Sequence, residues 1–434
     1  MTTTATGTAS LVGRRIGFYT SVVGMGGSEV LVADAMEAAS GAGARVVCWS
    51  DPAAAIRRVT AARCDRLRVE HRDWPAAAIA PMTIGECKSV PVARSTRSVG
   101  LKGVVRGLVP FVVKRYAGFR RTAKAFQSEL RAVAPDVLFV NVNGSEAVSL
   151  AGPMCGVPVV NCYHLSLTRS PGGPLMRWGD GLARRATLRA GALTVHTSAV
   201  VRDQWCHAYG YPADRVRLIY NGVDPRPLPD RGTKRAELGL SAGDFAFCVP
   251  GRLDPMKGHA DLIAAVALRR ESLTNAVFLV CGAGNLRDAL ERQAAAAGVA
   301  HLFRFLGWRT DLPEVLHAAD CTVLPSTESE NLSVAVLEGL MAGTPAVVTR
   351  VGGMAEAVLD GQTGLVIEPM DPPGLGAALA RLVADRELAR RFGEAAGHDA
   401  RERFIRTRMI RQYQELFAEM TMKFCSPRLA ERGE

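Results

Sequence analysis

The residues with the clearest chemical potential are Glu330 and Glu338, which lie eight positions apart in a polar loop and the helix-like run that follows it. The apolar run before them ends at Pro325, so the pattern predicts a strand, a loop and a helix, with Glu330 in the loop and Glu338 in the second helical turn. Eight residues along a helix rise about 12 Å, whereas carboxylates that share one glycosidic bond lie roughly 5 to 9.5 Å apart. The spacing therefore argues against a glycosidase and favours carboxylates that bind hydroxyls at the two ends of an extended ligand.

The start of this helix offers a place for an anion. Ser333 is the predicted N-cap and Gly343 the first residue beyond the helix, so the N–H groups around Asn331, Leu332 and Ser333 lie at the carboxyl end of a strand. Ligands bind at that edge of a parallel sheet, and free N–H groups at a helix start bind phosphate. A nucleotide sugar has the matching shape, with hydroxyls at both ends and a charged middle. Taken alone, the stretch also fits two glutamates that are simply exposed to solvent around the start of a helix and bind no ligand.

Two cations in a second loop are able to carry the charge of a diphosphate. An apolar strand begins at Phe245 and ends at Pro250, and Arg252 and Lys257 follow it before Gly258 and the next helix-like run. Cations in a Gly-rich loop at a strand end can neutralise a diphosphate without a metal ion. Taken by itself, the stretch also fits a basic loop that is simply solvated.

The first half of the chain contributes weaker candidates. Gly26 and Gly27 lie in a turn between a short strand at residues 15–19 and a helix-like run, and either a phosphate site or an ordinary tight turn fits there. His164 ends another apolar strand. A lone histidine in that place is more often structural than catalytic, so both positions need support from the rest of the chain.

Composition indicates a soluble protein of two domains. The chain has 434 residues, 48% of them hydrophobic, and a net charge of +11. Residues 1–7 lack an apolar leader and no run reaches the ~18 apolar residues of a membrane span, so we expect a cytoplasmic protein. The ten cysteines include no C-x-x-C pair, and no histidines cluster at ligand spacing. This predicts reduced cysteines and no metal site.

One segment holds most of the positive charge. Lys88 to Arg131 contains 11 basic residues and a single acid, Glu129, interleaved with apolar residues and interrupted by Pro110. Such a mixture suits an anionic membrane surface, to which the protein would attach peripherally. A solvated basic face on packed helices is the other interpretation. We do not expect nucleic acid as a partner.

Strand-like and helix-like runs alternate along both halves. Five strands alternate with helices across residues 245–367, which predicts an α/β domain with a doubly wound parallel sheet. A proline-dense linker at residues 225–229 separates the halves. A charged helix predicted from Asp399 to Lys423 carries its apolar residues on one side.

Several of these motifs together resemble those of a known family. Their residues match the pattern of the retaining GT-B glycosyltransferases of glycosyltransferase family 4: Glu330-x7-Glu338 with Gly343-Thr344-Pro345, G-R-L-x-x-x-K-G at residues 251–258, N-G-V-D at residues 221–224, and His164 after V-P-V-V. Two positions depart from it. The usual Gly-Phe-Gly after the first glutamate is Asn331-Leu332-Ser333, and the usual aspartate after the histidine is Leu165.

The resemblance implies the GT-B fold, with two Rossmann-like domains facing a cleft. The acceptor-side domain would span residues 1–224, the nucleotide-sugar domain residues 225–400, and a C-terminal helix at residues 401–434 would pack back on the first domain. The implied activity is transfer of a sugar, with retention, from a nucleotide-diphosphate sugar to a glycan or lipid-linked acceptor. No metal or other cofactor is expected.

The resemblance also assigns roles to residues. Glu330 would bind hydroxyls of the donor sugar and Glu338 the ribose, while Arg252 and Lys257 would stabilise the leaving diphosphate. His164 would lie beside the sugar. The remaining contacts to the donor would come from Gly26, Gly27, Asn331, Leu332 and Ser333.

Two other classes of protein stay open at this point. One is a nucleotide-sugar epimerase or a phosphorylase on the same scaffold, although the active-site loops that would favour it are not recognisable. The other is a non-catalytic scaffold that binds anionic membrane. The presence of all four donor-binding side chains, Glu330, Glu338, Arg252 and Lys257, argues against it. The base, the sugar and the acceptor cannot be read from the sequence.

Overall fold

The structure is a computed structural model, and the features below refer to the part of the chain that it describes. These residues are 10–20, 27–51, 54–74, 118, 120–141, 146–163, 185–328 and 330–424. Gly26, His164 and most of Lys88–Arg131 lie outside them, so the predictions for those positions are not addressed by the structure.

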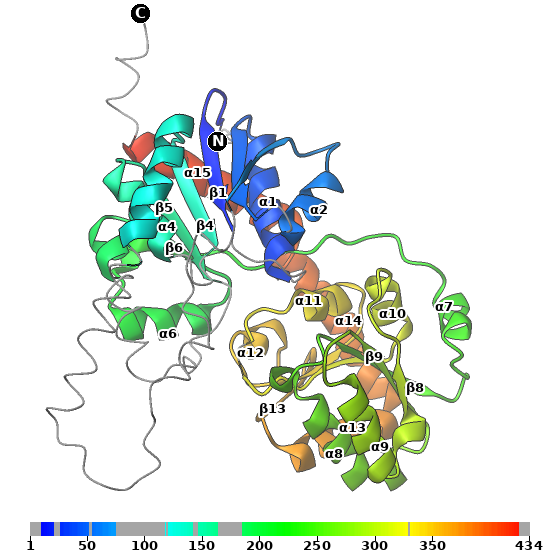
Figure 1. The fold of residues 1–434 in the computed structure, drawn as a ribbon. Helices are drawn as coiled ribbons and strands as arrows, with labels where there is room; N and C mark the ends of the chain where they lie inside the picture. Colours follow the sequence, from blue (N-terminus) through cyan, green and yellow to red (C-terminus); the bar gives the residue numbers. More distant parts are fainter. Residues whose placement is uncertain are drawn as a thin grey trace, which may run out of the picture.

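The first domain is built on a seven-stranded parallel sheet with the strand order β3-β2-β1-β4-β5-β6-β7 (Figure 1). Its strands are β1 (Arg15–Tyr19), β2 (Arg45–Ser50), β3 (Val69–Asp73), β4 (Val137–Asn141), β5 (Val159–Tyr163), β6 (Leu193–His196) and β7 (Val216–Leu218). The described helices include α1 (Gly27–Gly41), α2 (Ala55–Ala61), α4 (Glu146–Met154) and α6 (Ala199–Tyr209), and residues 120–133 are also helical.

The second domain carries a six-stranded parallel sheet with the order β10-β9-β8-β11-β12-β13. Its strands are β8 (Phe245–Pro250), β9 (Ala276–Cys281), β10 (Phe303–Phe305), β11 (Cys321–Leu324), β12 (Ala346–Thr349) and β13 (Gly364–Ile367). Its helices are α7 (Arg231–Glu237), α8 (His259–Leu268), α9 (Arg287–Ala296), α10 (Leu312–Ala318), α11 (Val334–Met341), α12 (Met354–Ala357), α13 (Pro372–Ala384) and α14 (Arg386–Arg403).

The predicted doubly wound α/β architecture is confirmed, because both sheets are wholly parallel and reverse their order beside their first strand. The predicted number of five strands for residues 245–367 is wrong, since the sheet has six. The additional strand is explained by β10, which has only three residues and is too short to show a clear strand pattern in the sequence.

Most strands of the two sheets read as apolar runs because helices cover both faces of each sheet, whereas β3, at an edge of the first sheet, is polar and not fully buried. In β4 all five residues are buried, and successive side chains alternate between two separate cores. Val137 and Phe139 pack on one side of the sheet, Leu138 and Val140 on the other. Each fully buried side chain of this kind contributes on the order of 1.5–3 kcal/mol through removal of apolar surface from water.

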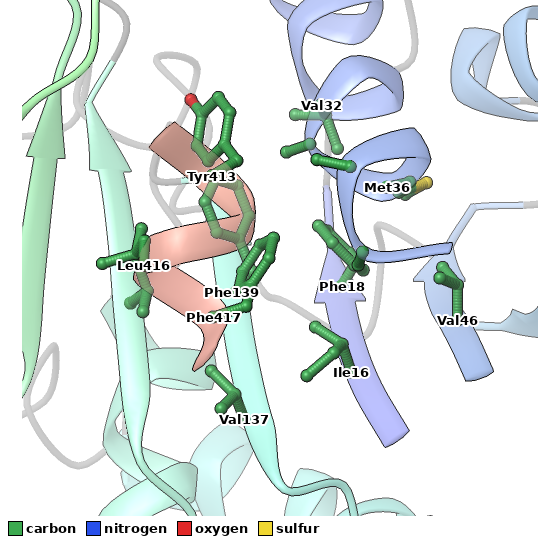
Figure 2. Packing of buried hydrophobic residues seen from close by; sticks show 14 of the residues in the cluster. Ile16, Phe18, Val32, Met36, Val46, Val137, Phe139, Tyr413, Leu416 and Phe417 are labelled. Carbon is green, nitrogen blue, oxygen red and sulfur yellow. The ribbon is translucent and has the colours of Figure 1, made fainter. Parts of the chain in front are cut away.

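The C-terminal helix returns to the first domain, as expected. Helix α15 (Arg406–Phe424) packs across the first sheet, with Tyr413, Leu416 and Phe417 against β1 and β4 (Figure 2). The rings of Phe417 and Phe18 meet edge to face at 5.8 Å between centroids. At its start, the Arg406 guanidinium binds Asp34 and Glu37 of α1 at 2.8 Å each.

The prediction of one continuous helix from Asp399 to Lys423 is wrong. Helix α14 ends at Arg403 and α15 begins at Arg406. Between them the backbone of Ile405 forms a β-bridge with Val223, and the Val223 N–H donates to the Phe404 carbonyl at 2.8 Å. These bonds to the segment around Val223 replace helical hydrogen bonds and interrupt the helix. The amphipathic pattern of the sequence continues across this break and therefore does not reveal it.

Candidate functional site

The candidate site lies where the strand order of the second sheet reverses. Strands β8 and β11 are neighbours there, with Thr322 opposite Cys248. Their carboxyl ends release two loops, residues 251–258 and 325–333, at the same edge of the sheet. Open α/β sheets bind ligands in the crevice outside the carboxyl ends of the strands at this kind of switch point.

The two loops meet in an ion pair between predicted site residues. The Lys257 ammonium lies 2.6 Å from Glu330 Oε2, and the Ser326 hydroxyl donates to the same oxygen at 2.8 Å. Both partners are largely removed from water, with 17% of the Lys257 side chain and 11% of the Glu330 side chain exposed. The structure therefore brings together two residues 73 positions apart in the chain. Ser326 completes the group and was not predicted.

A glycine sets how closely the two loops approach. Gly258 has φ +69°, and a Cβ built on it would lie 1.9 Å from the Pro325 carbonyl oxygen. Two residues beyond Pro325, the Thr327 N–H donates to the Met256 carbonyl at 2.9 Å. Only glycine fits both the left-handed backbone and the close contact. The position of Lys257 opposite Glu330 depends on that fit.

Arg252 does not join this group. Its guanidinium pairs with Asp254 at 3.0 Å, and 64% of its side chain is exposed. It therefore lies in the predicted loop but makes no described contact with Lys257 or Glu330. Its role toward a diphosphate stays a prediction.

Helix α11 begins after Ser333, which occupies the predicted N-cap position but makes no side-chain cap hydrogen bond. Just before it, Asn331 is 6% exposed, and its amide nitrogen and oxygen have no hydrogen-bond partner among the described residues. Leu332 packs in the core, and its carbonyl accepts a hydrogen bond from Asn221 Nδ2 at 2.6 Å. The structure thus holds a polar side chain without a partner at the start of a helix, next to Glu330.

Glu338 lies on α11, apart from the ion pair. The helix starts only at Val334, so the estimated rise of 12 Å over eight helical residues does not give its separation from Glu330. Its carboxylate is 3.6 Å from the Arg226 guanidinium. Burial raises the pKa of Glu338, and Arg226 acts in the opposite direction. Within the described residues, the linker that precedes α7 therefore supplies the charge partner of this glutamate.

His259 is a further polar residue at this edge that the sequence analysis missed. It is the first residue of α8, directly after Gly258, and is 4% exposed. Within the described part of the chain neither ring nitrogen has a hydrogen-bond partner, and burial lowers the pKa of the imidazole to about 4. It is therefore neutral at pH 7. Its only sequence signal was its place after Lys257-Gly258.

The described residues contain no group of three or more His, Cys, Asp or Glu side chains that could hold a metal ion. Nor does any helix in the described part of the chain have the length and apolar character needed to span a membrane.

Comparisons with known proteins identify the family models and relatives that this chain matches. Residues 230–399 match the family model described as glycosyl transferases group 1, and residues 25–226 match the model described as glycosyltransferase family 4. The glycogen synthase of Mycobacterium tuberculosis is 30% identical over 277 residues, which are 61% of this chain and 64% of that protein. The D-inositol 3-phosphate glycosyltransferase of Corynebacterium efficiens is 33% identical over 258 residues, 56% of this chain and 60% of that protein. The matched region thus spans about three fifths of these curated relatives.

Solved structures show the same fold. The Anabaena protein HepE in complex with UDP superposes with a TM-score of 0.70 at 20% identity, covering 94% of this chain and 100% of that one. Sucrose-phosphate synthase from Thermosynechococcus elongatus gives a TM-score of 0.70 at 19% identity with the same coverage. At these identities the likeness establishes the two-domain fold.

We predict that Gly258→Ala destabilises the protein more than Gly298→Ala does. Both glycines have positive φ, +69° and +72°, but a Cβ at Gly298 meets nothing within 4 Å. The Gly298 variant should therefore lose only about 1–2 kcal/mol from the left-handed backbone. The Gly258 variant should lose more, because the two loops must separate. Urea unfolding of both variants measures the difference, and equal losses would contradict the close approach described here.

Proposed function

This chain belongs to glycosyltransferase family 4, and we propose that it transfers a sugar from a nucleotide-diphosphate sugar to a glycan or lipid-linked acceptor with retention of configuration. The observation that carries the proposal is the ion pair of Lys257 with Glu330 at the switch point of the second sheet. It places a cation and a hydroxyl-binding carboxylate side by side, where the phosphate and sugar parts of one ligand would meet.

Each side chain has a distinct task in this proposal. Glu330 accepts hydrogen bonds from hydroxyls of the donor sugar, and Glu338 accepts them from the ribose. When the bond between the anomeric carbon and the diphosphate breaks, negative charge develops on the leaving oxygen. Lys257 stabilises that charge from a fixed position, and Arg252 approaches it from the exposed side of the loop. A preformed cation of this kind acts more strongly in the transition state than in the ground state.

The structure describes neither His164 nor the turn around Gly26, so their proposed places, beside the sugar and near the donor, rest on the family resemblance. The same holds for retention. Of the alternatives, a non-catalytic scaffold does not explain why Lys257 is buried against Glu330. A buried ion pair adds little to stability, because the cost of removing both charges from water can exceed their attraction. An epimerase on the same fold remains distinguishable, since it transfers no sugar to an acceptor.

We predict that Glu330→Gln and Lys257→Ala each lower kcat/KM for transfer by about a hundredfold or more while the protein stays folded, because removal of one preorganised electrostatic group costs about 10²–10³ in kcat. Screening UDP-, GDP-, ADP- and TDP-sugars by thermal shift first identifies the donor. Release of nucleoside diphosphate then measures turnover, and circular dichroism checks the fold.

Glu368→Gln is the matched control for these variants. Glu368 is 65% exposed and pairs with Arg350 at 2.8 Å, outside the proposed donor site. Its loss should leave turnover unchanged. Wild-type turnover in either Glu330→Gln or Lys257→Ala would exclude the assigned roles.

We also propose that transfer needs no metal ion, because Lys257 and Arg252 carry the charge that a divalent cation carries in metal-dependent transferases. Turnover should persist in EDTA. Loss of turnover on chelation, with recovery on addition of magnesium or manganese, would show that a metal carries this charge instead.

Peripheral attachment to an anionic membrane is a further part of the proposal. In the described helix at residues 120–133, Arg120, Arg121, Lys124 and Arg131 are exposed, and none has an acidic partner among the described residues. Each cation near an anionic surface is worth about 1 kcal/mol, so the four together would suffice for reversible docking. Docking through the first domain would bring a lipid-linked acceptor to the cleft.

We predict that the protein sediments with anionic vesicles at low salt and not with neutral vesicles or at high salt. Reversal of charge at Arg120, Arg121 and Lys124 should weaken this binding. Reversal at Arg269, Arg270 and Arg292, which are exposed in the second domain, should not. Equal recovery in the supernatant under all conditions would favour a solvated basic face and a soluble acceptor.

A further inference from the structure

A glutamate of the second domain caps a helix of the first. Glu356 lies in α12, and its two carboxylate oxygens accept hydrogen bonds from the backbone N–H groups of Ala199 and Val200 at 2.8 and 2.6 Å. These are the first two residues of α6, an 11-residue helix that begins at the carboxyl edge of the first sheet. Among the described residues of its own domain, the side-chain cap of α6 is the Ser198 hydroxyl, which accepts from Val201 N at 3.3 Å.

Other contacts hold this carboxylate in place. The Tyr220 hydroxyl donates to Glu356 Oε2 at 3.0 Å, and the Arg403 guanidinium donates to the Glu356 carbonyl. Arg403 is itself paired with Asp399 at 2.8 Å. A charged acceptor at a helix N-terminus bonds more strongly than a neutral one, because the free N–H groups and the helix dipole both favour negative charge.

The turn before Glu356 connects this contact to the ion-pair loop. Gly352 has φ +53°, and a Cβ there would lie 1.8 Å from the Glu330 carbonyl oxygen. Gly353 faces the other domain, since its Cβ would lie 2.4 Å from Ser198 Cβ and 3.4 Å from Asn331 Oδ1. One short turn therefore touches the backbone of Glu330 on one side and the start of α6 on the other.

We infer that Glu356 is a positioning residue that fastens the first domain against the donor side of the cleft and ties that contact to the loop carrying Glu330. A purely local capping role does not account for it, because both amides that it satisfies belong to the other domain. The inference rests on the proposed function only where it predicts an effect on sugar transfer. The role of Glu356 in the contact between the domains does not depend on that function.

Three variants test the inference. Glu356→Gln keeps the size of the side chain but loses its charge, and Glu356→Ala removes the acceptor altogether. Gly353→Ala pushes the domains apart by a different route: Gly353 has φ −85°, so alanine adds no backbone strain there, and its Cβ meets Ser198 first. Ser198→Ala is the matched control, because it removes a cap of α6 that lies within one domain.

Hydrogen exchange and small-angle scattering on the full chain are the primary measurements. In both Glu356 variants we expect exchange at Ala199 and Val200 to accelerate roughly tenfold or more, the factor expected for loss of a hydrogen bond to a charged group. The radius of gyration should rise in these variants and in Gly353→Ala. In Ser198→Ala faster exchange should be confined to Val201, with the radius of gyration unchanged. Pairing Gly353→Ala with Ser198→Gly should restore compactness, since glycine is tolerated at an N-cap.

Transfer kinetics form the second measurement. If the contact positions Glu330, kcat/KM should fall in all three variants and return with the Gly353→Ala, Ser198→Gly pair. Unchanged exchange at the start of α6, or an unchanged radius of gyration in both Glu356 variants, would overturn the inference. A wild-type protein that transfers no sugar would refute the proposed function, whereas exchange and scattering would still decide the role of Glu356.

Discussion

The ion pair between Lys257 and Glu330 imposes the strictest constraint on the second domain. Two charges held largely away from water cost desolvation free energy that their attraction offsets only when the geometry is good and further hydrogen bonds are present. The Ser326 hydroxyl supplies such a bond at 2.8 Å. Gly258 lets the two loops approach closely enough, with no room for a Cβ beside Pro325. As a purely structural contact the pair would cost desolvation free energy for little stability, whereas as a binding site it holds two charged groups in fixed positions.

Much of this arrangement could be predicted from sequence because its signals are local. The runs that form β8 and β11 are buried throughout and apolar except for Thr322, and parallel strands buried on both faces produce such runs. Each is followed by a loop with charged residues, so the motifs themselves placed Lys257 and Glu330 at one sheet edge. The return of α15 was predictable from the family resemblance, and the apolar residues on one side of the helix fit that packing.

The parts that sequence reasoning missed depend on contacts between distant segments. Nothing near Ile405 in the sequence signals its bridge to Val223, so the break between α14 and α15 could not be seen in an amphipathic pattern. Glu356 lies 157 positions from the amide of Ala199 that it binds. Arg252 shows the converse, because a matching motif predicted its loop but not that its side chain would face solvent beside Asp254.

The polypeptide crosses between the domains near Val223 and returns near Ile405, and the two crossings are bonded to each other. Asn221, just before the first crossing, donates to the Leu332 carbonyl in the loop that carries Glu330. A change in the angle between the domains would therefore strain the bond to that loop as well as the Glu356 cap on α6. Because buried hydrogen bonds are costly to leave unmade, the two domains and the donor loop should move together and not independently.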